Sequence, residues 1–341
     1  MPAPPLRHRR DRHPDGTRRT TDDGPAARRP VDVRRAPVVR RISSTVAAVA
    51  LLLAVPSAAS AWAPADSATI RPGSETRTDG GQCTANFVFV DGDDVLIGQS
   101  AHCATTGDAT DTDGCEAGSL PVGTPVTIEG ATRPGRIAYS SWVTMQARGE
   151  QDPDACAFND FALVRIDPAD HGRVNPSVPY WGGPTGLGAD TATGDPVHSY
   201  GASSLRVGLE LLKPKAGIAL GQTGGGWSHP VLTVTPGLPG DSGSAVLSRD
   251  GRALGTLSTL SLLPLPATNG IGDLRREVEY ARAHGAGMAG LRLATGTEPF
   301  AAVDAARAGR ELGARLQRDV AAILDGTTVR RLLGTLSGLV G

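Results

Sequence analysis

Long hydrophobic runs are almost absent from this sequence of 341 residues. The apolar run at residues 46–55 would form a helix of about 15 Å, half the thickness of a bilayer core, and no other stretch is long and apolar enough to span a membrane. Net charge is also nearly absent, at −1, whereas 39% of the residues are hydrophobic. A wholly disordered chain would carry more net charge and fewer apolar residues. We therefore expect a folded, soluble protein of one or two domains without a stable membrane span.

The first 61 residues differ from the rest of the chain. Residues 1–41 contain 12 Arg and 5 Asp, residues 42–61 contain no charged side chain, and residues 62–341 contain 22 basic and 30 acidic groups. A basic stretch, a short apolar run and the small residues Ala59-Ser60-Ala61 are typical of a secretory signal peptide. We expect translation to start near Val39 and the mature protein to be extracellular. Its acidic composition provides no long basic face, which excludes nucleic acid as a partner.

Four cysteines follow the signal, namely Cys83, Cys103, Cys115 and Cys156. Their even number fits an oxidising compartment in which disulfides form. Four cysteines allow three pairings, and spacing alone does not choose among them. The competing interpretation is a zinc site around His102, Cys103 and Cys115, but the C-x-x-C and H-x-x-x-H spacings of such sites are missing. We expect disulfides, with neither a metal ion nor a cofactor.

Short apolar alternations separated by Gly, Pro and Asp dominate from residue 83 onward. They predict strands joined by tight turns. The expected strands are residues 85–90, 95–99, 125–129, 135–140, 161–166, 196–201, 207–213, 231–234, 244–247 and 253–257. About ten short strands without an internal repeat favour an all-β barrel or sandwich. Helical periodicity is found only late, in residues 274–283, in a helix that starts near Thr297 and ends before Gly326, and in residues 329–340.

Three segments contain residue types that can perform acyl transfer together. They are IGQSAHC with His102, NDFALVRID with Asp160 and GLPGDSGSAVL with Ser242. A serine hydroxyl needs an imidazole base to attack a carbonyl group, and a buried carboxylate fixes the tautomer of that imidazole and stabilises its charged form. Taken singly, each residue would more often be an ordinary turn, loop or surface residue. Together they predict a His102-Asp160-Ser242 triad.

The glycines around Ser242 allow the backbone to form a binding site for a developing negative charge. Without a Cβ in the way, backbone N–H groups can converge on the negative charge that develops on a substrate carbonyl oxygen. The sequence predicts that the N–H groups of Gly240 and Ser242 form this oxyanion hole. Each such donor lowers the barrier by roughly 3–4 kcal/mol.

The three motifs resemble those of the chymotrypsin/trypsin-like serine proteases, in particular their secreted bacterial branch. SAHC resembles the histidine motif of that family, DFALV the aspartate motif and GDSGS the serine motif, and the resemblance covers roughly residues 83 to 285. It implies an all-β, chymotrypsin-like fold of two antiparallel six-stranded β-barrels, followed here by C-terminal helices. It also implies disulfides Cys83–Cys103 and, by exclusion, Cys115–Cys156. The similar segment LGTLST implies that Ser258 lies beside the buried aspartate.

The sequence departs from the family pattern around the pocket for the substrate side chain. Pro236 stands where trypsins have the aspartate that binds Arg or Lys, six positions before the serine. Thr259 and Leu260 replace an aromatic residue and a glycine of the pocket wall, and Leu238 replaces a cysteine. We therefore expect no preference for cleavage after Arg or Lys. The apolar, self-inserting amino terminus of animal trypsins is also absent.

These observations predict a secreted, monomeric serine endopeptidase that acts on peptide or protein substrates. The expected parts are a leader and signal peptide (1–61), a segment that is a possible short propeptide (62–82), the protease domain (83–295) and a helical extension (296–341). The alternative is an inactive binding or cell-surface protein with a protease fold. An α/β-hydrolase is excluded because G-x-S-x-G and the order Ser, Asp, His are both missing.

The extension contains an apolar stripe with a spacing of four residues. Its members are Leu312, Leu316, Val320 and Leu324, and we expect the stripe to be buried, because most such stripes face a core. The charged residues off the stripe are expected to face solvent; they are Arg310, Arg315, Arg318 and Asp319. The favoured interpretation is packing on the second barrel, and the alternative is docking to another chain or to the cell surface.

Overall fold

The computed structural model describes residues 62–79, 81–107, 112–188, 190–261, 268–302, 305–324, 326 and 330. The expected leader and signal peptide lie outside these residues, as does the expected helix at 329–340 except for Arg330. No helix in the described part of the chain combines the length and the apolar character needed to cross a bilayer.

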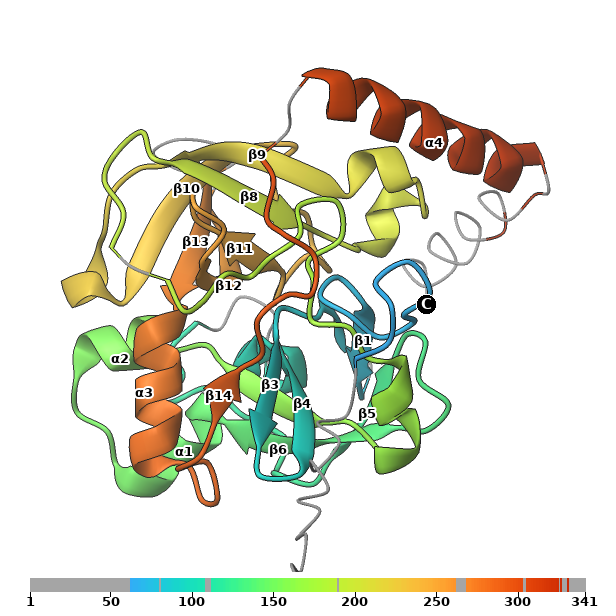
Figure 1. Ribbon diagram of the computed structural model, residues 1–341. Helices are drawn as coiled ribbons and strands as arrows, with labels where there is room; N and C mark the ends of the chain where they lie inside the picture. The colour runs from blue at the N-terminus through green and yellow to red at the C-terminus, as the bar shows by residue number, and fades with distance from the viewer. Residues whose placement is uncertain are drawn as a thin grey trace, which may run out of the picture. The chain divides into compact units, whose positions relative to one another are not determined.

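Antiparallel strands form two sheets, which occupy the lower and upper halves of Figure 1. The lower sheet has eight strands in the order β14-β3-β4-β7-β6-β5-β1-β2. Their bounds are β1 (Glu75–Thr78), β2 (Gly81–Thr84), β3 (Val88–Asp91), β4 (Asp94–Gln99), β5 (Pro125–Ile128), β6 (Gly135–Ser140), β7 (Ala162–Arg165) and β14 (Arg292–Leu293).

The upper sheet closes into a six-stranded barrel with the order β10-β13-β12-β11-β8-β9. The bounds are β8 (Pro196–Tyr200), β9 (Pro214–Ala219), β10 (Ser228–Val234), β11 (Ala245–Leu247), β12 (Ala253–Ser261) and β13 (Thr268–Asp273). The inward alternation expected of a closed sheet is visible in β10, where Val231 is buried and its neighbour Leu232 is exposed.

The expected all-β class and the second barrel are confirmed. The first sheet has eight strands instead of the expected six, because β1 and β2 extend one edge and β14 pairs with β3 at the other. The boundary expected at residue 83 falls inside β2, whose Cys83 pairs with Thr76 of β1. The segment before residue 83 is therefore part of the sheet in this structure.

Three of the four buried clusters in the described part of the chain lie within or between the two sheets. One lies within the first sheet and contains Val88, Ile97 and Val164, and a second fills the barrel around Val197 and Ile271. A third joins residues of both sheets with helix α3 (Leu274–His284), and its members include Phe87, Phe161, Tyr200, Leu247 and Val278. Burying one such side chain stabilises the fold by about 1.5–3 kcal/mol. The shared cluster explains why the two sheets meet along a packed junction.

One expected strand is wrong. Residues 207–213 follow the 3-10 helix η3 (Ser204–Arg206) and contain the 3-10 helix η4 (Glu210–Leu212), and the strand of this region is β9, which begins at Pro214. The physical reason is Arg206, which turns inward, is 2% exposed and donates to the Leu212 carbonyl. A chain wrapped around one buried guanidinium cannot extend as a strand.

The structure also contains helices where none was expected. Helix α1 (Ser141–Arg148) begins at Ser140, whose side chain accepts from Val143 N–H, and ends at Gly149 with φ +63°. Helix α2 (Pro153–Phe158) begins at Asp152. Helix α3 matches the expected helix at residues 274–283, and Asp273 caps it by accepting from Arg276 N–H.

The late helix is present as α4 (Ala305–Leu324), which begins later than the expected start near Thr297, and the expected exposure of three of its residues is wrong. Arg315 and Asp319, expected in solvent, are 5% and 6% exposed, whereas Val320 of the apolar stripe is 46% exposed. Arg318 is exposed as expected, and the side chains of Arg310, Leu312, Leu316 and Leu324 lie outside the described set. Arg315 and Asp319 are buried because they make polar contacts with the body, which are described below.

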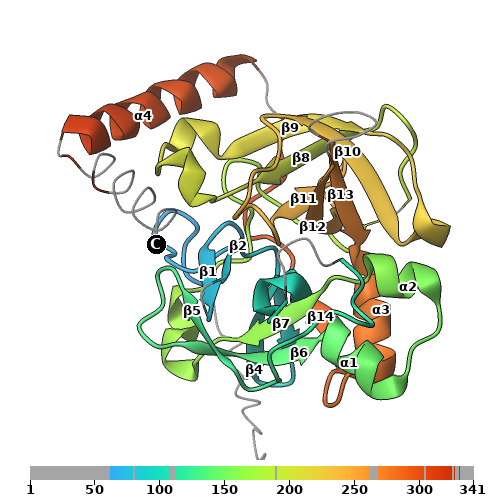
Figure 2. The same ribbon diagram turned by 180° about the vertical axis from the view of Figure 1, so that it is seen from behind.

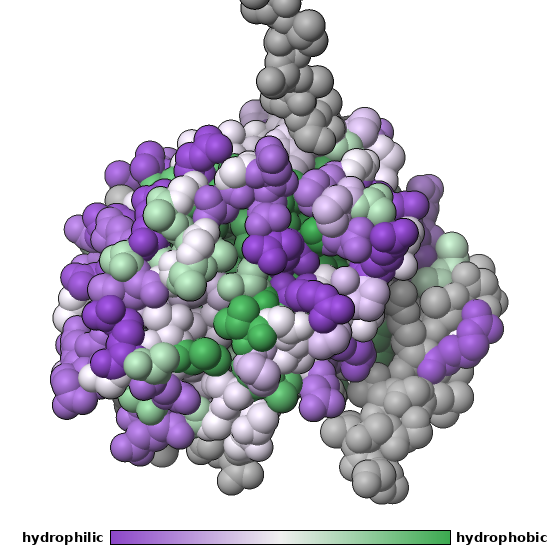
Figure 3. Space-filling view, turned by 90° about the horizontal axis from the view of Figure 1, so that it is seen from below, coloured by the Kyte–Doolittle hydropathy of each residue, from purple (hydrophilic) through white to green (hydrophobic). Residues whose placement is uncertain are grey.

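Figure 3 shows the molecule from below, which is the side of the first sheet. Hydrophilic residues predominate on this face, and they surround a small hydrophobic group near its centre. A surface of this kind is typical of a protein whose apolar residues are mainly inside.

Candidate active site

Strand pairing brings His102 and Asp160 together. Gln99, at the end of β4, pairs with Ala162, at the start of β7, so that the residues after β4 and before β7 lie side by side. The 3-10 helix η1 (Ala101–Ala104) then presents His102 to Asp160. His102 Nδ1 lies 2.6 Å from Asp160 Oδ2, and the His102 backbone N–H donates to Asp160 Oδ1 at 2.9 Å.

The carboxylate of Asp160 is buried and has a third partner. Ser258 Oγ donates to Asp160 Oδ2 at 2.6 Å, which confirms the expected position of Ser258. Burial disfavours the charged carboxylate, but the charge of His102 and the hydrogen bonds outweigh this and hold the pKa of Asp160 below 3.8. Burial disfavours the imidazolium as well, yet Asp160 raises the pKa of His102 above 6.5.

Backbone hydrogen bonds bring the Ser242 segment to the same place. Gly243 N–H donates to the Leu257 carbonyl at 2.7 Å, and Ser100 Oγ, two residues before His102, donates to the same carbonyl at 3.0 Å. Thr84 N–H donates to the Ser242 carbonyl at 2.8 Å. Among the described residues, no hydrogen bond joins the Ser242 hydroxyl to His102. Such contacts are often long before substrate binds.

The loop around Ser242 has two backbone N–H groups for which the described part of the chain provides no acceptor. Gly240 and Gly243 have φ of +91° and +88°, and a Cβ at Gly243 would lie 2.4 Å from the Thr84 carbonyl oxygen. Asp241 N–H donates to the Leu238 carbonyl, but no hydrogen bond to a described residue uses the N–H of Gly240 or of Ser242. The two expected oxyanion donors are therefore available to a ligand.

Sequence reasoning missed the buried ion cluster next to Ser242. Asp241, Arg206 and Lys215 are all at most 2% exposed. Asp241 Oδ2 contacts the guanidinium of Arg206 and lies 3.0 Å from Lys215 Nζ. Space for the ammonium group exists because residue 201 is a glycine, whose Cβ would lie 2.4 Å from Lys215 Nζ. A signal was present, because Lys215 is one of only two lysines in the chain.

Burial and opposite charge shift the pKa of both ends of this cluster. Burial disfavours the carboxylate, but Lys215 and Arg206 outweigh it and lower the pKa of Asp241 to about 2. Burial and the like charge of Arg206 lower the pKa of Lys215 to about 8, although Asp241 opposes this shift. At neutral pH the cluster thus contains one anion and two cations.

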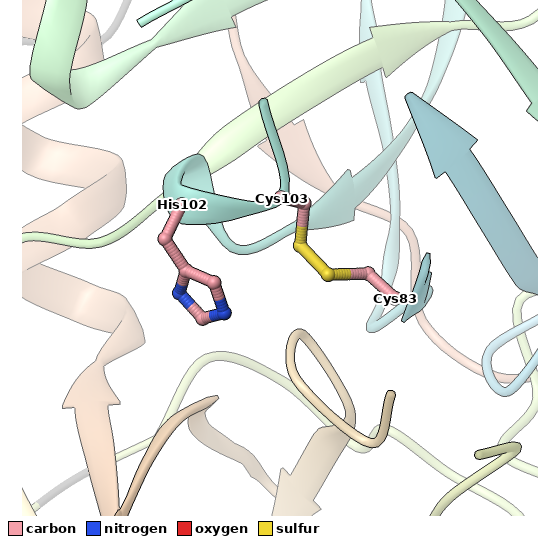
Figure 4. Close-up of side chains that lie close together, drawn as sticks. All are labelled: Cys83, His102 and Cys103. Atoms are coloured by element: carbon pink, nitrogen blue, oxygen red, sulfur yellow. A yellow bond between two sulfur atoms is a disulfide. The ribbon is translucent and has the colours of Figure 1, made fainter. Parts of the chain in front are cut away.

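Both expected disulfides are confirmed. Cys83–Cys103 joins β2 to η1, and Figure 4 shows the His102 ring beside it. Cys115–Cys156 is the second bridge. Candidate metal-binding groups that use Cys83, His102 and Cys103, or Asp113, Cys115 and Cys156, contain sulfurs of these bridges. A sulfur in a disulfide is not a thiolate ligand, which is evidence against the zinc interpretation.

The segments before Ser242 and after Ser258 are joined by one buried amide. Asn269 Oδ1 accepts from Gly237 N–H at 2.9 Å, and Asn269 Nδ2 donates to the Thr259 carbonyl at 3.1 Å. Pro236 presents its carbonyl to Arg206 at 3.0 Å, and Leu260 is 41% exposed. Residues 236–240 and 259–261 of these two segments have no charged side chain, whereas Asp241 is charged and is paired with Arg206 and Lys215.

Comparison with known proteins gives matches only among solved structures, since no family model and no curated protein matches the chain. Thermobifida fusca protease A has 18% identity over 67% of this chain and 99% of its own, with a TM-score of 0.44. Cellulomonas bogoriensis chymotrypsin has 16% identity over 66% and 98%, with a TM-score of 0.41. Nocardiopsis protease has 18% identity over 66% and 98%, with a TM-score of 0.40. These proteins are bacterial proteases, the group that the three motifs resemble. At such identities and TM-scores the likeness assigns no activity, so function depends on the geometry of the site.

Proposed function

We propose that this chain is a secreted serine endopeptidase in which Ser242 is the nucleophile, His102 the general base and Asp160 the orienting carboxylate. The observation that carries the proposal is the double hydrogen bond from His102 to the buried Asp160. It fixes the ring with Nδ1 on the carboxylate and leaves Nε2 for a proton. The shared Leu257 carbonyl ties the Ser242 loop to the same segment.

In the proposed reaction, Ser242 Oγ attacks the carbonyl carbon of a peptide bond while His102 Nε2 takes its proton. The negative charge that develops on the carbonyl oxygen is stabilised by the free N–H groups of Gly240 and Ser242. The imidazolium is stabilised by Asp160 and protonates the leaving amine. Water, activated by His102, then hydrolyses the acyl-enzyme and regenerates the serine.

The proposed substrates are peptides or proteins with an uncharged side chain at the cleaved position. Support comes from residues 236–240 and 259–261, which Asn269 joins and which have no charged side chain, while the Asp241 carboxylate is already paired with Arg206 and Lys215. A buried substrate cation without an opposite charge is strongly disfavoured. The two disulfides support an extracellular site of action. A peptide library profiled with the secreted protein should therefore show no dominance of Arg or Lys before the cleaved bond. A profile dominated by either residue would refute this part of the proposal.

A fluorophosphonate probe tests the activity directly, because it labels only a serine activated by a base. We expect labelling of the secreted protein, and its loss in both Ser242→Ala and His102→Ala. Ser67→Ala is the matched control, since Ser67 is an exposed serine far from the triad in sequence, and it should label like the parent. Equal labelling of the parent and Ser242→Ala would exclude Ser242 as the nucleophile. A parent that is never labelled would favour the inactive binding protein.

A further inference from the structure

Helix α4 binds the body of the protein through charged side chains. Both carboxylate oxygens of Asp319 accept hydrogen bonds from η4, from Glu210 N–H at 2.8 Å and from Leu211 N–H at 3.1 Å. Arg315 Nη1 donates to the Glu210 carbonyl at 2.8 Å, and its guanidinium lies 4.0 Å from the centre of the Tyr180 ring. In Figures 1 and 2, α4 lies beside the segment that connects β8 to β9, which contains η4.

The last carbonyl of η4, that of Leu212, accepts a hydrogen bond from Arg206, which belongs to the buried ion cluster. Arg206 Nη1 donates to the Leu212 carbonyl and, at 2.8 Å, to Thr235 Oγ1. Arg206 Nη2 donates to the Pro236 carbonyl at 3.0 Å and to Asp241. Arg206 is therefore held on one side by the short helix that α4 contacts and on the other by the residues that lead to Ser242.

Asp241 continues this network into the loop with the free backbone donors. Its carboxylate accepts from Leu238 N–H and from Ser203 N–H, both at 3.0 Å. Residues 237–243, here called the oxyanion loop, include Gly240 and Ser242 on either side of Asp241. The direction of those two N–H groups thus depends on where the Asp241 carboxylate is held.

The buried charges make the network sensitive to small displacements. Asp241 is 0% exposed and Arg206 is 2% exposed, so a shift that separates them leaves a charge in the interior without its partner. Removing one partner of a buried ion pair is far more destabilising than losing a surface pair. The segment between β8 and β9 therefore has to be fixed for the oxyanion loop to keep one conformation, and α4 fixes it from outside.

We propose that Asp319 and Arg315 of α4 are positioning residues for the oxyanion loop, acting through η4, Arg206 and Asp241. This inference rests on the proposed function, because it assigns the loop a catalytic task. The helical extension is then part of what makes the site competent, although it touches no substrate.

The test compares Asp319→Ala and Asp319→Asn with Gln317→Ala, an exposed position on the same helix. Asp319→Ala should lower kcat roughly ten-fold or more and leave KM within about two-fold, because the oxyanion donors act mainly in the transition state. Asp319→Asn keeps one acceptor and should fall between the parent and Asp319→Ala. Gln317→Ala should equal the parent. If Asp319→Ala does not fold, Asp319→Asn carries the same comparison.

A double-mutant cycle with Arg206→Lys tests whether Asp319 acts on the oxyanion loop through Arg206. If the effect passes through Arg206, Asp319→Ala should cost much less activity in the Arg206→Lys background than in the parent. Fully additive losses of kcat from Asp319→Ala and Arg206→Lys would show that the effect does not pass through Arg206. A merely structural helix would lower the melting temperature of the variants without changing kcat at a temperature where all are folded, and this would overturn the proposal.

Hydrogen exchange separates this inference from the proposed activity. Amides of residues 237–243 should exchange faster in Asp319→Ala than in the parent and in Gln317→Ala, whether or not the protein hydrolyses anything. If the parent hydrolyses nothing but exchange is still faster in Asp319→Ala than in the parent, the protease assignment is refuted and the link between α4 and the loop is retained. Unchanged exchange together with unchanged kcat would overturn the inference and leave the protease assignment intact.

Discussion

At the scale of single residues, the contact between His102 and Asp160 governs the expected pH dependence. The pKa of His102 is raised above 6.5, and the ring must be neutral to accept a proton from Ser242. Activity should therefore rise with pH through that raised pKa, with half of the maximum kcat/KM reached above pH 6.5. A pH profile of kcat/KM between pH 4 and 9 measures it.

The comparison variant for this profile is Asp160→Asn. Without the carboxylate, burial alone acts on the imidazole, so its pKa should fall and the midpoint of the profile should move to lower pH. The maximum should drop on the order of 10⁴-fold, because the ring loses both its tautomer and its stabilised charge. A midpoint that stays in place would contradict the assignment of Asp160.

His102 and Asp160 also make the free energy of unfolding depend on pH, and they do so in opposite directions. Since the folded pKa of His102 lies above its usual value, its contribution is complete below pH 6.5 and is lost as pH rises through the folded pKa. Since the folded pKa of Asp160 lies below 3.8, its contribution is present above that value and is lost as pH falls through the folded pKa.

Ser258→Ala tests the third partner of Asp160. It removes the hydrogen bond at 2.6 Å to the buried carboxylate, and hydrogen bonds to charged groups contribute about 1.5–3 kcal/mol. We expect kcat/KM to fall roughly ten-fold and the folded protein to lose stability on acidification at a higher pH than the parent. Activity assays and urea unfolding at pH 4 and pH 7 measure both effects. Unchanged values in both would show that the carboxylate is oriented by His102 alone.

The sequence predicted the residues whose chemistry shows in short motifs. His102, Asp160 and Ser242 were predicted because the residue types of acyl transfer stand beside recognisable strands, and the position of Ser258 was implied by the family resemblance of LGTLST. Arg206 was not predicted, and the expected strand at residues 207–213 began directly after it. Its partner Asp241 is 35 positions away, and only the folded chain brings the two together.

At the scale of elements, the disulfide Cys83–Cys103 holds η1 and therefore His102 against β2. It closes a separation of 20 residues, for which the chain-entropy model gives about 3 kcal/mol. The double variant Cys83→Ala/Cys103→Ala should lose about that much free energy of unfolding, and kcat/KM should fall because the helix that carries His102 is released. Chemical denaturation and kinetics on the same preparation provide the two values.

The matched control is Cys115→Ala/Cys156→Ala, which opens a longer separation of 41 residues away from β2. The model gives it a similar or slightly larger stability loss. Activity in the folded control should be closer to that of the parent. Equal losses of kcat/KM in the two double variants would show that neither bridge positions His102 specifically.

Element prediction succeeded where apolar alternation was regular and failed where polar groups decided the backbone. Residues 135–140 alternate and form β6 with the expected bounds. The expected strand at 207–213 failed because Arg206 is satisfied only by a tight turn around it. Helix α1 was overlooked although Ser140 and Gly149 are typical cap residues at its two ends.

At the scale of the whole molecule, the candidate site lies where segments of both sheets meet. His102 and Asp160 follow and precede strands of the first sheet, whereas Ser242 and Ser258 belong to segments of the barrel. The cluster that includes Phe161, Tyr200 and Leu247 packs across the same junction. The barrel arrangement was predictable from strand content and family resemblance. The docking of α4 was not predictable, because apolar periodicity places charged residues such as Arg315 and Asp319 in solvent, whereas both are buried.

Deletion of residues 303–341 tests the role of the extension in the whole fold. Thr297 and Glu298 remain and keep the hydrogen bonds of their N–H groups to Ser177 Oγ. The described polar contacts between α4 and the body are those of Arg315 and Asp319, and Val320 of the same helix is 46% exposed.

The truncated protein should therefore be secreted, monomeric and folded, with a melting temperature lowered by no more than about 4 °C, but with the reduced kcat expected of Asp319→Ala. Size-exclusion chromatography, calorimetry and kinetics measure these three properties. A truncated protein that aggregates or is degraded would show that α4 completes the core of the barrel. One with the kcat of the parent would show that the oxyanion loop is held without it.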